Sequence, residues 1–158
     1  MYECFTDRGR SVLQFANEEA QRLNHEYISP EHILLGLVND NASAAIEVLQ
    51  HFGIDPHVIP QKVEEIVAVG ATRAPSGKLP LSAKTKNVIE FAKEEAQRLG
   101  ENLVAPEHVL LGLVRADDAV ATPVLLKLGL NLENVRVVLN RMKPGRPGAR
   151  VGPMAGMP

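Results

Sequence analysis

The sequence is poor in aromatic side chains, in cysteine and in charge of one sign. Aromatic residues make up 4% of the 158 positions and tryptophan is missing, which disfavours the stacking platforms that single-stranded nucleic acids need. The formal net charge of -2 gives no bulk attraction to nucleic acid or to anionic lipid. Cys4 is the only cysteine, so neither an intramolecular disulfide nor a cage of thiolate ligands around a metal can form.

Long apolar runs and catalytic motifs are also missing. No apolar stretch approaches the roughly 20 residues that cross a bilayer, and the N-terminal residues lack the basic region and apolar run of a secretory signal. The sequence contains neither a P-loop nor a nucleophile elbow. We therefore expect a non-enzymatic, cytoplasmic protein that needs no cofactor and that binds neither nucleic acid nor a membrane.

What the sequence does contain is an internal repeat. Residues 29–38, Ser-Pro-Glu-His-Ile-Leu-Leu-Gly-Leu-Val, return 76 positions later at 105–114 as Ala-Pro-Glu-His-Val-Leu-Leu-Gly-Leu-Val. Aligned without a gap, residues 6–66 and 82–142 are identical at 21 of 61 positions. Because self-similarity at a fixed spacing marks a repeated structural unit, we expect both halves to fold alike.

Each half of the repeat predicts four helices. Thr6 is a hydroxyl cap before a long helical pattern, Pro30 suits the first position of a second helix, and Gly53 suits the left-handed end of a third. Gly36 would let another helix approach closely. Because no segment alternates like a strand, the predicted fold is all-α, with two four-helix repeats packed as a pseudo-twofold compact bundle.

The composition also predicts the boundaries of these units. The first repeat covers residues 1–69 and the second covers residues 82–142. Between them, residues 70–81 are rich in Gly and Pro and predict a linker. The last segment, 143–158, is rich in Pro and Gly and predicts a flexible tail.

Three motifs carry a resemblance to a known family. They are the Phe-Thr-Asp-Arg opening at residues 5–8, the run Glu-Glu-Ala-Gln-Arg-Leu that occurs twice, and the doubled Glu-His-x-Leu-Leu-Gly-Leu-Val helix. In this order the motifs resemble the Clp N-terminal repeat domain, most closely the N domain of ClpC-type AAA+ unfoldases. The resemblance covers residues 1 to about 142 and implies one compact all-α domain.

The resemblance also implies a function. In that family the domain takes substrates and adaptor proteins to a hexameric ATPase, which threads them into the ClpP peptidase. Since the 158 residues hold no ATPase motif, the resemblance implies an adaptor, a competitor for adaptors, or the receptor domain of a longer chain. The alternative is an accessory or regulatory subunit that binds the Clp ATPase or peptidase without recognising a mark.

ClpC N domains are also binders of phosphorylated arginine, so the resemblance implies two such sites. A carboxylate can accept paired N–H bonds from the guanidinium group, while a capped helix N-terminus can bind the phosphate. A basic residue one turn into the helix would neutralise the phosphate. The positions that match are Glu31 with Thr6 and Arg10 in the first repeat, and Glu107 with Ser82 and Lys86 in the second.

The same residues also have simpler interpretations. The two hydroxyls are ordinary caps, the two carboxylates favour the dipoles of the helices that they begin, and the two basic side chains are solvated. A metal held by Glu31 and His32 with their counterparts is not expected, because neighbouring helix positions point in different directions. Inter-helix hydrogen bonding near the start of a buried helix is the expected role of His32 and His108.

Overall fold

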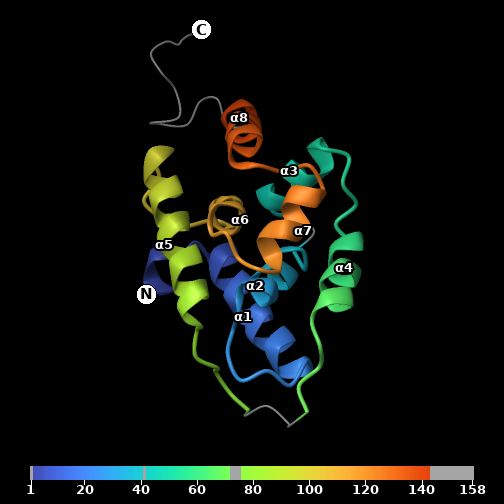
Figure 1. The fold of residues 1–158 in the computed structure, drawn as a ribbon. Coiled ribbons are helices and arrows are strands. Elements are labelled where there is room, and N and C mark those ends of the chain that lie inside the picture. Colours follow the sequence, from blue (N-terminus) through green and yellow to red (C-terminus); the bar gives the residue numbers. More distant parts are fainter. Residues whose placement is uncertain (1, 41, 72–75, 143–158) are drawn as a thin grey trace, which may run out of the picture.

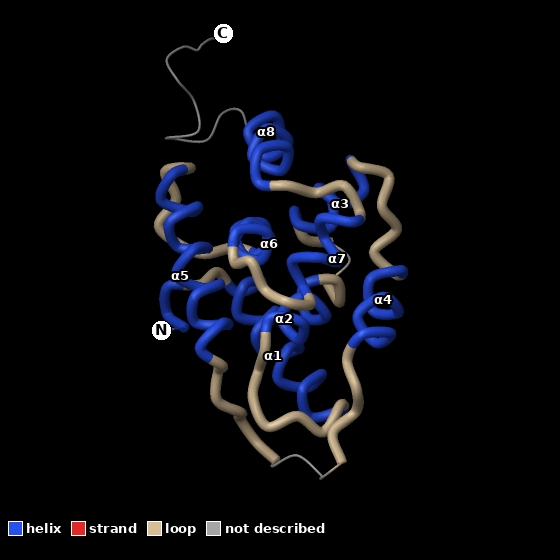
Figure 2. Tube along the Cα trace, viewed as in Figure 1, coloured by secondary structure: helices blue, strands red, loops and turns tan. Residues whose placement is uncertain are grey.

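A computed structural model describes residues 2–40, 42–71 and 76–142, and all regular secondary structure in these ranges is helical (Figure 2). The all-α prediction is thereby confirmed, and the predicted tail at 143–158 lies outside the described residues. After a 3₁₀ turn over Tyr2–Cys4, the helices are α1 (Asp7–Arg22), α2 (Pro30–Leu37), α3 (Ala44–His51), α4 (Val58–Ile66), α5 (Ala83–Arg98), α6 (Pro106–Arg115), α7 (Ala121–Lys127) and α8 (Leu132–Met142). None of these helices is long and apolar enough to cross a bilayer.

The first helix of each repeat begins at the predicted hydroxyl cap. Thr6 Oγ1 accepts a hydrogen bond from the Gly9 N–H at 3.0 Å, and Ser82 Oγ accepts one from the Thr85 N–H at 3.2 Å. Each bond satisfies one of the backbone N–H groups that a helix N-terminus leaves without an intrahelical partner. Both α1 and α5 are 16 residues long, so the two repeats start alike.

The second helix of each repeat is capped by a histidine. The Ser29 N–H donates to Nδ1 of His32 at 2.9 Å, and the Ala105 N–H donates to Nδ1 of His108 at the same distance. Ala105 has no hydroxyl, so the imidazole, three residues into the helix, is the cap that both repeats share. The sequence predicts inter-helix bonding for these histidines; the structure instead shows each bonded to the backbone of its own helix's N-cap.

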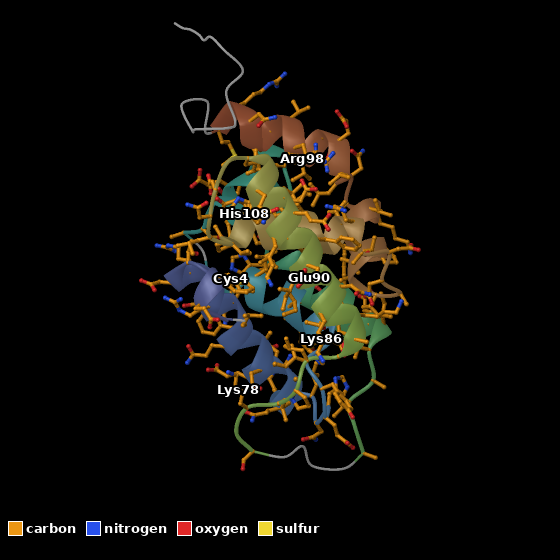
Figure 3. The ribbon with its side chains drawn as sticks, turned by 90° about the vertical axis from the view of Figure 1, so that its left-hand side faces the viewer. Cys4, Lys78, Lys86, Glu90, Arg98 and His108 are labelled. Carbon is orange, nitrogen blue, oxygen red and sulfur yellow. The ribbon has the colours of Figure 1, made fainter. Side chains whose placement is uncertain are left out.

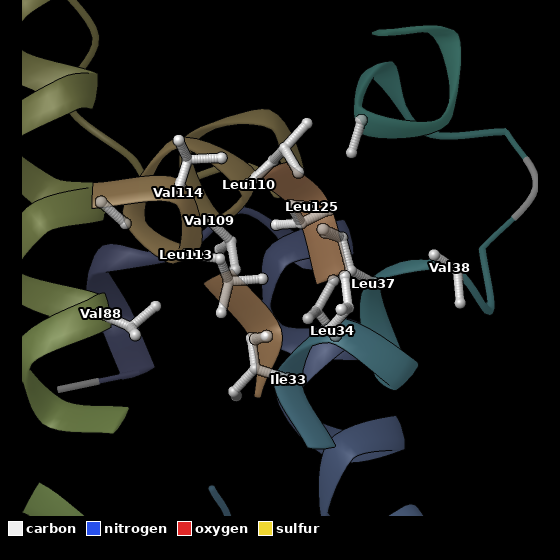
Figure 4. Packing of buried hydrophobic residues seen from close by; sticks show 14 of the residues in the cluster. Ile33, Leu34, Leu37, Val38, Val88, Val109, Leu110, Leu113, Val114 and Leu125 are labelled. Atoms are coloured by element: carbon white, nitrogen blue, oxygen red, sulfur yellow. The ribbon is translucent and has the colours of Figure 1, made fainter. Parts of the chain in front are cut away.

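The core lies where α2 and α6 meet (Figure 4). Ile33 and Leu34 from α2 and Leu110 and Leu113 from α6 are fully buried, and a side chain of this size contributes about 1.5–3 kcal/mol when it is buried. Helix α1 packs on α2 and α5 packs on α6. A Cβ atom at Gly36 would collide with the backbone of α1, so the predicted close approach is confirmed.

Two short bridges then join the repeats crosswise. Phe5 pairs with Val104, and Leu81 pairs with Ile28. Each bridge continues into a backbone hydrogen bond. The Thr6 N–H donates to the Val104 carbonyl at 2.9 Å, and the Ser82 N–H donates to the Ile28 carbonyl at 3.0 Å. As a result, the first helix of each repeat starts beside the second helix of the other repeat, and the chain's N-terminus lies next to α5 (Figure 1).

The connection between the repeats packs on α1 at both of its described ends. At one end the Gly70 N–H donates to the Leu23 carbonyl at 2.8 Å. At the other end the Leu79 N–H donates to Asn17 Oδ1 at 2.7 Å, and Leu79 is buried. The described part of the predicted linker is therefore held along the first helix.

Candidate functional site

The crosswise bridges create a hollow where three helices begin. It has a volume of about 390 Å³ and lies at the N-termini of α1, α3 and α6. We call it the first pocket, and its lining residues are Thr6, Asp7, Arg8, Ala42, Ser43, Ala44, Ala105, Pro106 and Glu107. Because each helix N-terminus carries partial positive charge and unbonded backbone N–H groups, their convergence favours an anion at this place.

The side chains of the first pocket place acid and base close together. Arg8 is more than half exposed, and its Nη1 donates to Asp40 Oδ2 at 2.6 Å. Asp7 points outward and is paired with Arg10. Glu107 is 2% exposed, so one carboxylate lies in the wall while the charges of the rim face solvent.

Glu107 also belongs to a cluster with Glu101 and His108, whose ligand atoms lie within 4.8 Å of one another. The tautomer of His108 decides what this cluster can hold. Nδ1 accepts the Ala105 N–H, so the proton of the neutral ring is on Nε2, which lies 3.4 Å from Glu101 Oε1. A metal ion would need the lone pair of that nitrogen, and the cap bond therefore favours a proton between imidazole and carboxylate.

The corresponding cluster in the first repeat contains a second histidine. His32 Nε2 lies 2.7 Å from His25 Nδ1, and His25 Nε2 lies 2.8 Å from the Ala68 carbonyl. Because His32 Nδ1 accepts the Ser29 N–H, each ring carries its proton on Nε2 and donates it to the next acceptor. Burial and then the nearby His25 lower the pKa of His32 to about 4, so the His32 ring is neutral near pH 7.

Glu31 lies beside this histidine chain and is partly buried. Burial raises the pKa of Glu31 above its usual value, the negative charge of Asp118 acts in the same direction, and a backbone hydrogen bond and His25 oppose them. Since Asp118 lies at the start of α7, Glu31 faces the second repeat, as Glu107 faces the first.

The structure therefore regroups the residues expected to bind phosphoarginine. Thr6 lines one hollow with Glu107 of the other repeat. Ser82 is bonded to the segment that leads into Glu31, again in the other repeat. The sequence instead predicts that Thr6 pairs with Glu31 and that Ser82 pairs with Glu107. The physical reason is the crosswise bridging, which exchanges the starts of α1 and α5 between the repeats.

The two predicted basic residues also take other places. Arg10 donates to the Phe5 carbonyl at 2.9 Å and lines a second hollow of about 380 Å³ with Leu13 and Ile28. Lys86 is exposed on α5 and lies apart from His108 (Figure 3).

Arg8 and Ser43 also line the first pocket, although the sequence motifs do not single them out as binding residues. Arg8 stands in the Phe-Thr-Asp-Arg opening, two positions before Arg10. Ser43 accepts the Ile46 N–H at 3.3 Å as the cap of α3. A hydroxyl that follows the break after the second helix is the signal that would have found it.

This arrangement can be compared with known proteins. The family model of the Clp repeat (R) N-terminal domain matches residues 4–128 and also 82–148. The chain belongs to the Clp repeat N-terminal domain family. Among curated Clp relatives, the chain is 40% identical over 136 residues to the chaperone protein ClpB of Oceanobacillus iheyensis, and 38% identical over 142 residues to the chloroplastic chaperone protein ClpC of Pisum sativum.

These two matches cover 86% and 90% of the chain but only 17% and 15% of the relatives. The chain thus spans about a sixth of the length of the curated Clp proteins that it matches. Among solved Clp structures, the N-terminal domain of ClpD from Arabidopsis thaliana aligns with a TM-score of 0.62 at 27% identity, over 90% of this chain and 97% of that one.

A second solved structure is the ClpV N-domain in complex with a VipB peptide. It aligns with a TM-score of 0.72 at 16% identity, over 93% of this chain and 91% of that one. At this identity the likeness concerns the fold alone. The pseudo-twofold all-α bundle is thus the architecture of the Clp N domains.

Proposed function

We propose that the chain is a non-enzymatic recognition module of a Clp protein-unfolding system, which binds protein substrates or adaptors for a Clp ATPase. The support is membership of the Clp N-terminal repeat family, together with a ClpV N-domain of the same fold that was solved with a peptide. Some relatives are chloroplast proteins, so the cytoplasmic location expected from the sequence stays a prediction.

We further propose that the first pocket binds the side chain of phosphorylated arginine. One observation carries this proposal: the caps Thr6 and Ser43 and the buried carboxylate of Glu107 line a single hollow. The helix N-termini and Arg8 suit the phosphate oxygens. The carboxylate suits the guanidinium N–H groups, which it can accept in pairs.

The helix N-termini set the expected preference for the phosphorylated side chain. An anion at one N-terminus gains about 0.3–1 kcal/mol, so three converging helices give about 1–3 kcal/mol. This free energy corresponds to a preference of about 5- to 150-fold over unmodified arginine. Screening by salt will lower it, because the rim of the pocket is exposed.

Calorimetric titration with free phosphoarginine tests the proposal, with arginine as the reference ligand. We expect the wild type to bind phosphoarginine, and Glu107→Gln and Thr6→Val each to weaken the binding by about tenfold or more. Ser11→Ala, which removes an exposed hydroxyl from the same helix, is the matched control and should bind as the wild type does. No detectable heat with the folded wild type would contradict the proposal.

The alternative function is an accessory or regulatory subunit that binds the Clp ATPase or peptidase without recognising phosphoarginine. The second hollow favours it, because apolar side chains of Leu13 and Ile28 line it beside Arg10 and Lys78, and because it shares no lining residue with the first pocket. Leu13→Asp should then abolish co-elution with a purified Clp ATPase hexamer, while Glu107→Gln should leave it unchanged.

A further inference from the structure

We propose that the two repeat-related pockets are not equivalent: the first pocket accepts the phosphorylated guanidinium group, and the Asp118 carboxylate closes its counterpart to a phosphate. This inference rests on the function proposed above. We call this counterpart the second pocket. It is the region between Ser82 at the start of α5, Glu31 at the start of α2, and the start of α7. It differs from the second hollow, which Leu13 and Ile28 line.

The pseudo-twofold defines the second pocket. The Ser82 N–H bonds to the Ile28 carbonyl at 3.0 Å, as the Thr6 N–H bonds to the Val104 carbonyl at 2.9 Å. Helix α2 contacts α5 and α7, as α6 contacts α1 and α3. The start of α7 therefore faces Glu31 in the way that the start of α3 faces the first pocket.

The two places differ in what caps the third helix. Asp118 is 7% exposed, and its Oδ2 accepts the Val120 N–H at 2.9 Å and the Ala121 N–H at 2.8 Å. The equivalent position in the first repeat is Ala42, and a neutral hydroxyl of Ser43 caps α3 there. Among the described residues, the one carboxylate bonded to this loop is Asp40, which accepts only the Ala42 backbone N–H and is neutralised by Arg8. A fixed carboxylate thus occupies the N–H groups that the phosphate would need.

The negative charge of Asp118 also disfavours a phosphate at this place. A phosphate carries a charge of about −1.5 to −2 near pH 7, and a buried carboxylate repels it through a medium that screens less than water does. Burial and the charge of Asp118 also raise the pKa of Glu31, as expected where further negative charge is disfavoured.

An independent difference concerns the capping hydroxyls. Thr85 Oγ1 donates its proton to the Ile28 carbonyl at 2.7 Å. It must therefore accept the proton of Ser82 Oγ, which lies 3.0 Å away. Ser82 already accepts the Thr85 N–H, and its hydroxyl has no proton left for a ligand.

In the first repeat, Gly9 stands at the position of Thr85 and has no side chain. Thr6 Oγ1 accepts the Gly9 N–H, and within the described residues its own proton is given to no protein acceptor. The first pocket therefore keeps a hydroxyl donor that the second pocket has lost. Exposed lysines on α5, Lys84 and Lys86, attract anions to the surface without restoring this donor or removing Asp118.

Titration with phosphoarginine, followed both by calorimetry and by backbone amide NMR, tests the inference. We expect one equivalent per wild-type chain, a shift of the Gly9 amide signal, and at least about tenfold weaker binding at the second pocket. Glu107→Gln should abolish the tight site, whereas Glu31→Gln should leave it intact.

Asp118→Asn is the decisive variant, because asparagine keeps the capping oxygen and removes the charge. The cap bonds and the Ser82–Thr85 hydroxyl bond remain, so only the charge repulsion is lost; we expect binding at the second pocket to become about tenfold tighter, with a new shift of the Thr85 amide during the titration. Asp117→Asn removes the same charge from the exposed neighbour, where φ is +55° and asparagine is tolerated. This control should bind as the wild type does.

Three results would overturn the inference. They are two equal sites in the wild type, a single site that Glu31→Gln removes, and an Asp118→Asn variant whose Thr85 amide responds to phosphoarginine as the wild type's does. Each of these leaves phosphoarginine binding itself intact. If neither the wild type nor Asp118→Asn binds phosphoarginine, the proposed function fails instead.

Discussion

The two repeats share their core but differ in how they hold an acidic residue on the first helix. Gly36 and Gly112 pack against α1 and α5 in the same way, and at both a Cβ atom would collide with the backbone of the neighbouring helix. Glu95 on α5 is fully buried, whereas its counterpart Glu19 on α1 is only partly buried. Identical residues in equivalent positions thus have different surroundings.

The surroundings of Glu95 come from arginines at the end of α6 and on α8. Its Oε2 accepts Arg115 Nη1 of α6 at 2.9 Å and Arg136 Nη2 of α8 at 2.6 Å, and its Oε1 accepts Arg136 Nε at 2.9 Å. Although burial opposes it, the hydrogen bonds and charges of these arginines hold the pKa of Glu95 below its usual range. The equivalent positions in the first repeat are Asn39 and Pro60, which offer no cation.

Glu95→Ala is expected to have the largest effect. It leaves two partly buried arginines without their shared acceptor, and breaking a buried ion pair in this way costs about 3–5 kcal/mol. We expect the free energy of unfolding in urea to fall by that amount, with exposure of the α6–α8 contact. The measurement is a denaturant curve at pH 7.

Glu19→Ala is the matched substitution in the first repeat. Arg22, which binds Glu19 at 2.8 Å, is about half exposed, so the loss should stay below about 1 kcal/mol. An equal loss of unfolding free energy in the two variants would show that the pairing of Glu95 with Arg136 of α8 stabilises the fold no more than a surface ion pair does.

The histidine caps differ between the repeats in a second way, which predicts an effect of pH. His32 donates to the His25 ring, whereas His108 faces the Glu101 carboxylate. Because the pKa of His32 is lowered to about 4, the unfolded chain takes up the proton first as pH falls. The stabilisation is complete above about pH 6.5 and is lost progressively towards pH 4, by about 3 kcal/mol in all.

His32→Gln should remove this loss. Glutamine at the same position can accept the Ser29 N–H as the partner in a capping box, so the variant should fold near pH 7. Between pH 7.5 and pH 4.5 we expect its free energy of unfolding to fall by about 2–3 kcal/mol less than that of the wild type. His51→Gln, at an exposed position, should behave as the wild type. If the unfolding free energy of His32→Gln depends on pH as that of the wild type does, His32 is not the source of the acid destabilisation.

These differences mark the limit of what the sequence could predict about the fold. Local propensity and residue spacing predict the helices, the caps at Thr6 and Ser82 and the glycine contact at Gly36. These signals do not depend on how the two repeats pack together. The left-handed end at Gly53, where φ is +73°, is equally local. The crosswise bridges involve one residue pair each and leave no alternating pattern to detect.

The candidate site shows the same limit. The carboxylates Glu31 and Glu107 were identified because the repeat marks them, but their partners depend on which helix starts meet, and this is a property of the tertiary structure. Arg10 was chosen by its distance along one helix, while Arg8 lines the pocket. The role proposed for Asp118 could not be inferred without its backbone partners.

The smallest expected effect concerns the segment that lies along α1. Asn17 holds it with two hydrogen bonds, from Nδ2 to the Gly77 carbonyl at 3.0 Å and from the Leu79 N–H to Oδ1 at 2.7 Å. Its counterpart Lys93 on α5 instead pairs with Glu90 at 3.2 Å. Asn17→Ala should cost about 1 kcal/mol, because two net hydrogen bonds are lost while helix propensity improves, and Lys93→Ala should cost less than about 0.5 kcal/mol.

Hydrogen exchange at the Leu79 amide separates this local effect from global destabilisation. We expect exchange to accelerate about fivefold or more in Asn17→Ala, as a loss of about 1 kcal/mol in local opening implies, and not at all in Lys93→Ala. Asn17→Asp keeps the oxygen that accepts the Leu79 N–H and should restore much of the protection. If exchange at Leu79 is the same in all three variants, the contact with α1 does not hold this segment, and buried Leu79 itself is what anchors it.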